Sequence, residues 1–212
     1  MPNRRLSRVL LACLLPGCLI AAAALRHLPK PVMAQATSVS NAAYAPTYTK
    51  EGDLVPPLQY REWIYLTSGL NMSYTPKSDP SMSMFDNVFV NPEAYRSFLT
   101  TGTWPDKTVM VLETRGASSK GSINKSGHFQ SGEPMGLEIH VKDEARFPGK
   151  WAFFDAASES RATLFPQTAT CYSCHAQHAA VDTTFVQFYP TLLPLAQKKG
   201  TLSSAYLKES AQ

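Results

Sequence analysis

Five consecutive residues in the last quarter of the sequence carry its most specific chemistry: Cys171-Tyr172-Ser173-Cys174-His175. Two cysteines separated by two residues and followed at once by histidine form the C-x-x-C-H pattern that attaches c-type haem. One short helical turn brings the two thiols to the two vinyl groups on one edge of a porphyrin. His175 is then carried beneath the iron, where imidazole is a usual axial ligand. The motif predicts a single covalently attached haem c, held by Cys171 and Cys174 and ligated by His175.

Two other uses of a C-x-x-C pair fit the sequence less well. A thioredoxin-like redox pair usually follows a strand within a βαβ pattern, and residues 165–170 have no strand pattern. A tetrahedral zinc site needs further ligands. After residue 36, only His128, His140 and His178 remain to supply them. Haem attachment is therefore the favoured interpretation.

Residues 1–36 have the features of a secretory signal peptide. Basic residues within 4–8 precede an apolar run over 9–25, and Ala34-Gln35-Ala36 offers the small-x-small pattern that signal peptidase recognises. We therefore expect export to the periplasm or another compartment outside the cytoplasm. If the leader is not cleaved, its apolar run becomes a membrane anchor. Cys18 also gives the leader a loose resemblance to a lipoprotein cleavage site.

The charge of the chain gives no support for a nucleic-acid partner. The whole sequence has 20 basic and 16 acidic residues, hence a net charge of +4 and a pI near 8.9. Five of the basic residues and no acid lie in the leader, which leaves 15 basic against 16 acidic residues and a net charge of about −1. The basic pI therefore describes the precursor, and we expect no nucleic-acid binding.

The remaining length suits one domain of ordinary size. Residues 37–53 are rich in Ser, Ala and Thr and are expected to be a disordered lead-in, with one haem domain over 54–212. Alternating or continuous apolar patterns predict strands at 85–90, 108–114, 137–142 and 151–154. A helix is predicted over 92–99, with Pro92 in its first turn and Gly102 after its end. The pattern predicts a mainly β (α+β) fold: an antiparallel sheet with a few flanking helices and a C-terminal helical segment that carries the attachment motif.

Taken in order, these segments resemble the cytochrome P460 family, which is related to the β-type cytochromes c′. The resemblance extends from about Leu54 to Leu193. The matching stretches are 60–63, 88–95, 136–138 with 141–143, 151–154, and 171–175 followed by 185–190. It implies a homodimer, an antiparallel β fold and a haem with histidine on one side and an open coordination site on the other.

Members of this family divide in function. Some resemble hydroxylamine-oxidising enzymes in which a lysine is bonded to the porphyrin edge, and others resemble gas-binding proteins that take NO or CO. The resemblance implies that the cross-linking lysine would fall within residues 108–113, at the position that is Leu112 in this sequence. Lys107 is an odd number of residues away, on the opposite face of a strand, and Lys120 and Lys125 would have to swing in from a Gly/Ser-rich loop. We therefore predict no cross-link.

Several further residues are candidates for the surroundings of the haem. Met110 shares a strand face with Leu112 and is the first candidate for a sixth ligand, ahead of Met84 and Met135, although methionine in a strand more often serves packing. His140 alternates with apolar neighbours and is predicted to point to solvent. The strand carboxylates Glu113 and Glu138 are predicted to be solvated, and are the ones to examine for proton transfer. Arginines that could pair with haem propionates are Arg115, Arg146 and Arg161.

The leading hypothesis is an exported, dimeric, single-haem protein with five-coordinate iron on His175 that binds NO or a related small nitrogen species. One alternative is an enzyme that oxidises hydroxylamine or a similar compound, or performs peroxide chemistry, at the open site. A second alternative is a low-spin electron carrier with a methionine ligand. The sequence does not identify a redox partner protein.

Overall fold

The computed structural model describes residues 44–73 and 83–211. The expected signal peptide over 1–36, with its uncleaved-anchor alternative, lies outside these residues. Within the described part of the chain, no helix has the length and apolar character needed to span a membrane.

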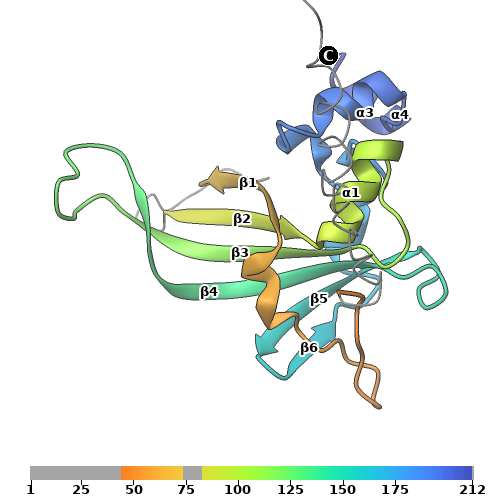
Figure 1. Cartoon of the computed structure of the whole chain (residues 1–212), viewed down its shortest axis with the longest axis horizontal. Helices are drawn as coiled ribbons and strands as arrows, with labels where there is room; N and C mark the ends of the chain where they lie inside the picture. The colour runs from red at the N-terminus through yellow and green to blue at the C-terminus, as the bar shows by residue number, and fades with distance from the viewer. Residues whose placement is uncertain (1–43, 74–82, 212) are drawn as a thin grey trace, which may run out of the picture. The chain divides into compact units, whose positions relative to one another are not determined.

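Within residues 44–73 and 83–211, six antiparallel strands form one sheet in which every strand pairs with the next along the chain (Figure 1). The predicted mainly β fold is therefore confirmed. The two longest strands extend as a hairpin away from the helices (Figure 1). The strands are β1 (Ile64–Leu70), β2 (Met84–Val90), β3 (Val109–Ser118), β4 (Phe129–Lys142), β5 (Trp151–Ser158) and β6 (Arg161–Leu164).

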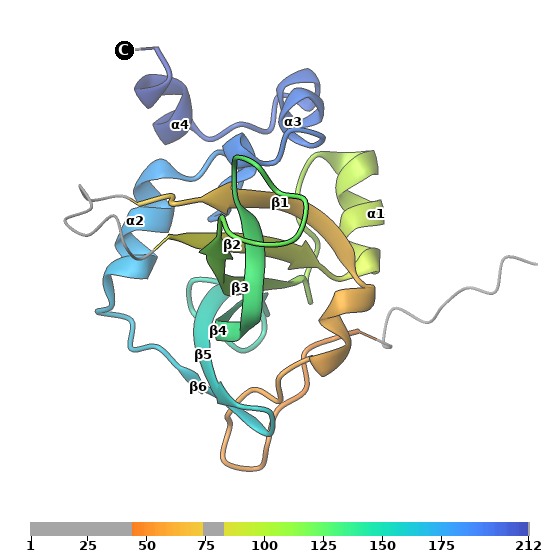
Figure 2. The same ribbon diagram turned by 90° about the vertical axis from the view of Figure 1, so that its left-hand side faces the viewer.

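Short helices flank the sheet. In Figure 2, α2 lies to the left of the strands and α1 to the right, with α3 and α4 above β1. The predicted helix at 92–99 is confirmed as α1, and Gly102 ends it in the left-handed conformation (φ 76°) that glycine adopts without strain. The helices are η2 (Leu58–Glu62), α1 (Pro92–Thr101), α2 (Thr170–His178), η3 (Val186–Phe188), α3 (Leu193–Lys199) and α4 (Ser204–Glu209).

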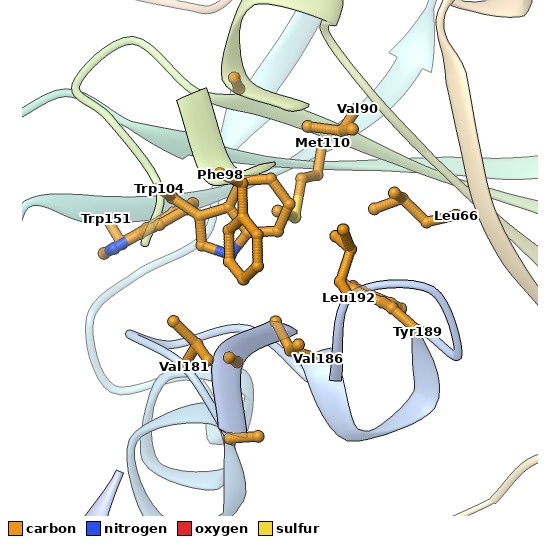
Figure 3. Packing of buried hydrophobic residues seen from close by; sticks show 13 residues of the cluster. Leu66, Val90, Phe98, Trp104, Met110, Trp151, Val181, Val186, Tyr189 and Leu192 are labelled. Atoms are coloured by element: carbon orange, nitrogen blue, oxygen red, sulfur yellow. The ribbon is translucent and has the colours of Figure 1, made fainter. Parts of the chain in front are cut away.

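Both faces of the sheet are packed. The face that carries Val90 and Met110, here called the helix face, lies against Phe98 of α1 and against the segment around Val186 and Leu192 (Figure 3). The opposite face carries a second cluster, built from the side chains that alternate with the first set. Its largest members are Leu54, Tyr60, Trp63, Ile139, Phe147 and Phe154. Burial is greatest at the helix-proximal ends of β3, β4 and β5, whereas the first ten positions of β4 are exposed or partly exposed.

The segment before η2 is packed as well, so the expected disordered lead-in is wrong for residues 44–53. Tyr48 and Leu54 form an isolated β-bridge, and Leu54 forms another with Ala162 of β6. The ring of Tyr44 lies 6.0 Å from that of Trp63 in an edge-to-face arrangement. These aromatic contacts bury apolar surface, which offsets the entropy lost on ordering the segment. Residues 37–43 lie outside the described part of the chain.

Candidate functional site

The attachment motif lies on α2, as predicted. Cys171, Cys174 and His175 stand three and four residues apart, which places them on one side of a helix. Both cysteines are free thiols and are partly exposed. Burial raises the pKa of the Cys171 thiol, and the negative charge of Glu138 contributes in the same direction. The motif therefore offers two thiols and an imidazole along one helix face, with Glu138 nearby.

Tyr172, between the two cysteines, fixes α2 to the sheet. Its ring lies edge-on to that of Phe153 in β5, with 4.9 Å between centroids. Its hydroxyl accepts a hydrogen bond from the backbone N–H of Phe153 (3.3 Å) and donates one to the carbonyl of Phe165 (3.2 Å). One variable position of the C-x-x-C-H pattern thus sets where the motif sits against β5.

The imidazole of His175 is held in one tautomer. Its Nδ1 lies 2.7 Å from the carbonyl oxygen of Thr183, and because a carbonyl only accepts hydrogen bonds, Nδ1 carries the proton. Burial lowers the pKa of His175, while the hydrogen bond to Thr183 opposes that shift. The neutral ring therefore has its lone pair on Nε2, for which no hydrogen bond is found among the described residues. This is the state in which histidine binds a metal.

His140 is buried beside His175, so the prediction that it points to solvent is wrong. It is 8% exposed, its ring stacks on Phe153 at 3.9 Å, and it meets the His175 ring edge-on at 5.2 Å. Burial, together with the neighbouring His175, lowers the pKa of His140 well below its ordinary value, so the ring is neutral. Strand alternation correctly assigned His140 to the face opposite Ile139. The C-terminal segments cover that face, so His140 is buried there.

Cross-strand pairing divides the helix face into rows of side chains. One row, here called the covered row, lies beneath the helices and His175, and its members are at most 8% exposed. It consists of Val90, Met110, His140 and Phe153. The next row, here called the open row, is partly or fully accessible to solvent. It consists of Val88, Leu112, Glu138 and Asp155.

Glu138 belongs to the open row, on the same face as Leu112. It retains contact with solvent, but partial burial and the nearby charges of Asp155 and Asp86 raise its pKa. The Glu138 side chain is exposed, as predicted for a solvated carboxyl group. A carboxyl group whose pKa is raised holds its proton to higher pH and can serve as a proton donor as well as an acceptor.

The lysines considered for a cross-link lie away from Leu112. Lys107 precedes β3 in a left-handed conformation (φ 65°), and its ammonium group pairs with Asp143 and Asp106. Lys120 and Lys125 are exposed in the loop between β3 and β4. The six residues of β3 that follow Leu112 amount to about 20 Å of strand before that loop begins. Leu112 itself is partly exposed in the open row.

Met110 is packed in the core. It is 4% exposed, and Figure 3 shows it beside Val90 and Phe98, with Leu192 facing them. This position favours the packing interpretation over a role as iron ligand. Met84 is partly exposed in β2, and Met135 is exposed in β4.

Glu113 lies on the opposite face and is 1% exposed, so the prediction of a solvated charge is wrong. Its carboxylate accepts hydrogen bonds from Tyr60, from Arg115 (2.7 Å) and from Asn87 (3.2 Å), and it pairs with Arg61. Burial acts to raise the pKa of Glu113, but these donors outweigh burial and the pKa is lowered. The cluster joins η2 to the sheet.

The three arginines proposed as propionate partners have other contacts. Arg115 is bound to Glu113, and the guanidinium of Arg146 lies 3.9 Å over the Tyr48 ring and contacts the carbonyl of Gly52. Arg161 pairs with Asp53 at 3.5 Å. Of the remaining histidines, His128 is exposed and His178 pairs with Glu209.

The residues on the helix face fit a haem. Two thiols and a neutral imidazole with a free Nε2 form a suitable donor set, and the open row beside them presents Val88 and Leu112 to an apolar ring. Within the described residues, no group of three or more His, Cys, Asp or Glu side chains is arranged to hold a metal ion directly. The zinc alternative therefore gains no support. Cys171, Cys174 and His175 are the residues that would hold the haem.

Sequence reasoning missed Thr183, Phe185 and Tyr172 as parts of this site. The ring centroid of Phe185 lies 4.2 Å from that of His175. Only the proximity of these residues to the motif in the sequence could have indicated them. A β-rich domain with its C-x-x-C-H helix laid against the sheet defines a class of haem protein distinct from the small helical cytochromes c.

The family model for cytochrome P460 matches residues 57–186, more than half of the chain. The protein belongs to the cytochrome P460 family, as the resemblance indicated, and membership implies a haem cofactor. No individual curated protein matches the chain.

Proposed function

We propose that the protein is an exported single-haem c-type cytochrome whose iron is ligated by His175 and binds NO, or a similarly small nitrogen species, at an open site. The observation that supports this most directly is the occupant of the lysine position. Leu112 lies in the open row beside the motif, whereas Lys107 pairs with Asp143, and Lys120 and Lys125 are exposed in the loop between β3 and β4. The proposal includes a homodimer, which rests on the family resemblance.

The side chains of this chain would do the following work. Cys171 and Cys174 hold the haem edge, and His175, fixed by Thr183, provides the iron ligand. When bound, the haem supplies an iron that takes a diatomic ligand and changes oxidation state. Val88 and Leu112 present apolar surface, which favours neutral ligands such as NO and CO over anions. Glu138 is placed to donate a hydrogen bond or a proton at the edge of that surface.

Glu138 also gives weight to the second candidate function, oxidation of hydroxylamine or a related compound. Removing electrons from an N–H compound releases protons, and a carboxyl group beside the site can accept them. The raised pKa of Glu138 suits that task. The third candidate, a low-spin electron carrier, loses support because Met110 is packed in the core.

The first test is the absorption spectrum of the purified protein, oxidised and reduced, before and after addition of NO. A high-spin c-type spectrum that shifts with NO is expected, with no strongly red-shifted reduced band. Cys171→Ala and Cys174→Ala should weaken or abolish covalent attachment, measured as haem retained after denaturation. A red-shifted reduced band in the wild type would show a lysine cross-link and move hydroxylamine oxidation to first place.

A further inference from the structure

The carbonyl that accepts the hydrogen bond from His175 belongs to a tight turn directly after α2. Val181 and Thr184 form a β-bridge that closes this turn, and Asp182 within it has a left-handed backbone (φ 52°). The hydroxyl of Thr184 donates to the carbonyl of Val181 at 2.8 Å. We call residues 181–184 the proximal turn. Its third residue, Thr183, presents its carbonyl oxygen to His175 Nδ1.

A buried tryptophan from another part of the chain holds the proximal turn at one point. Trp104, in the segment between α1 and β3, donates its indole Nε1–H to the Thr184 hydroxyl at 2.7 Å. Trp104 and Thr184 are each 1% exposed. A hydrogen bond between two buried groups is costly to break, because both partners then lose solvation without compensation.

A buried lysine holds the same turn at a second point. Lys142, the last residue of β4, is 7% exposed, and its ammonium group donates to the carbonyl of Trp104 at 2.6 Å. It also lies 3.6 Å from a carboxylate oxygen of Asp182, and that oxygen accepts a hydrogen bond from the Trp104 backbone N–H at 3.4 Å. Lys142 of the sheet contacts Asp182, and Trp104 of the segment after α1 contacts both Asp182 and Thr184. These contacts fix the proximal turn on either side of Thr183.

We infer that Trp104, Lys142, Asp182 and Thr184 are positioning residues for the iron ligand. By fixing the proximal turn, they hold the Thr183 carbonyl where it accepts the His175 Nδ1–H, which sets the orientation and electron density of the imidazole. The inference rests on the proposed role of His175 as ligand. None of these four residues touches the His175 ring, so they act through the Thr183 carbonyl.

The consequence for the iron has a definite sign. A strong hydrogen bond from Nδ1–H makes the imidazole a better electron donor, which favours the ferric state. Loosening the proximal turn weakens that bond. The iron–histidine stretching band of the ferrous protein should then move to lower frequency, and the reduction potential should rise.

Thr184→Val is the principal test, made on the haem-loaded protein. Valine keeps the shape of threonine and removes the hydroxyl that Trp104 contacts. We expect the iron–histidine Raman band to shift down and the one-electron reduction equilibrium to change about tenfold toward the ferrous form, which equals about 59 mV. Thr184→Ser, which keeps the hydroxyl, should retain the Raman band and the reduction potential of the wild type.

Thr108→Val is the matched control. Thr108 is also fully buried, and its hydroxyl donates to the carbonyl of Pro105 at 2.7 Å, outside the proximal turn. This variant should lose stability without moving the Raman band or the potential. Asp182→Asn provides a second variant that folds readily, because asparagine tolerates the left-handed backbone, and it should shift both readouts in the same direction as Thr184→Val.

The inference is overturned if Thr184→Val and Asp182→Asn both keep the wild-type band and potential. It is also overturned if Thr108→Val moves them as far as Thr184→Val does, since general loosening would then explain the effect. His175→Ala distinguishes failure of this inference from failure of the proposed function. Loss of the iron–histidine band in this variant would show that His175 is the iron ligand. If that band persists, His175 is not the ligand and the proposed function fails as well.

Discussion

Leu112 of β3 lies directly opposite Glu138 of β4 in the antiparallel register, so an apolar and a carboxyl side chain meet in the open row. Because register partners share a face of the sheet, any ligand on that face beside Leu112 is also within reach of Glu138. Under the proposed function, the position expected for a cross-linking lysine is occupied by Leu112, with Glu138 as its cross-strand neighbour. The open row therefore combines the apolar surface of Leu112 with a neighbouring group, Glu138, that can donate a proton.

Ionisation of Glu138 should make the reduction potential depend on pH. Its pKa lies above the ordinary 4.5, so the group loses its proton in the range above that value. The resulting negative charge beside the haem stabilises ferric iron, and the potential should fall as pH rises through this pKa. Glu138→Gln should have a higher potential at neutral pH and a flat profile over the same range, measured by spectroelectrochemical titration. Equal slopes in both proteins would exclude Glu138 as the source.

Protonation of the unfolded state at His140 should reduce stability in mild acid. The folded pKa of His140 is lowered, so below pH 6.5 the unfolded chain binds a proton that the folded protein does not. This difference removes at most about 1.4 kcal/mol of unfolding free energy per pH unit until the folded group also titrates. Urea titrations of the haem-loaded protein at pH 8 and pH 5 should show a smaller acid loss in His140→Phe.

His128→Gln is the matched control for this experiment, because His128 is exposed in the loop between β3 and β4. Its pH dependence should follow that of the wild type. An acid loss in His140→Phe as large as that of the wild type would assign the effect to other groups.

Glu113→Gln should destabilise the fold by about 2–4 kcal/mol, because it leaves Arg61 and Arg115 facing a neutral partner in a buried cluster. The pKa of Glu113 is lowered in the folded state, so its contribution to stability is present above pH 4.5 and is lost as pH falls toward the folded value. The variant should therefore lose less stability than the wild type below pH 4.5, measured by chemical denaturation. Glu159→Gln, at an exposed site between β5 and β6, should have little effect on either measurement.

Tyr172→Phe should loosen the attachment helix from β5. The change removes the hydroxyl that joins Phe153 and Phe165, and it should cost about 1–3 kcal/mol, since the backbone N–H of Phe153 loses its partner. Hydrogen exchange should show faster opening of α2 relative to the sheet. Tyr65→Phe, which removes a hydroxyl from an exposed tyrosine of β1, should leave both the stability and the exchange of α2 unchanged.

Local patterns were enough to predict much of the fold. Strand alternation identified β2 to β5, and Pro92 and Gly102 marked the limits of α1. The short strand β6 and the helices α3 and α4 were not predicted. Four residues in β6 and seven in α3 are too few for a periodic signal to stand out.

Burial of polar residues was the main failure of sequence reasoning. A period of two assigns side chains to alternate faces, but it does not say what covers each face, so His140 was expected to be exposed. The partners of Glu113 show the same limit, because Tyr60 lies 53 positions away in the sequence. Contacts of this kind depend on the tertiary fold, and the C-x-x-C-H motif was predictable because all its residues are local.

The order of elements along the chain has a consequence for maturation. All six strands, from Ile64 to Leu164, precede Cys171, and proteins emerge from synthesis N-terminus first. Because every strand pairs with its neighbour in sequence, the sheet needs no contribution from the later segment to establish its pairing. The sheet can therefore form before Cys171 and Cys174 have been synthesised. Under the proposed function, haem attachment to Cys171 and Cys174 would therefore take place on a short helix that follows a sheet already paired, and docking of that helix on β5 would complete the site.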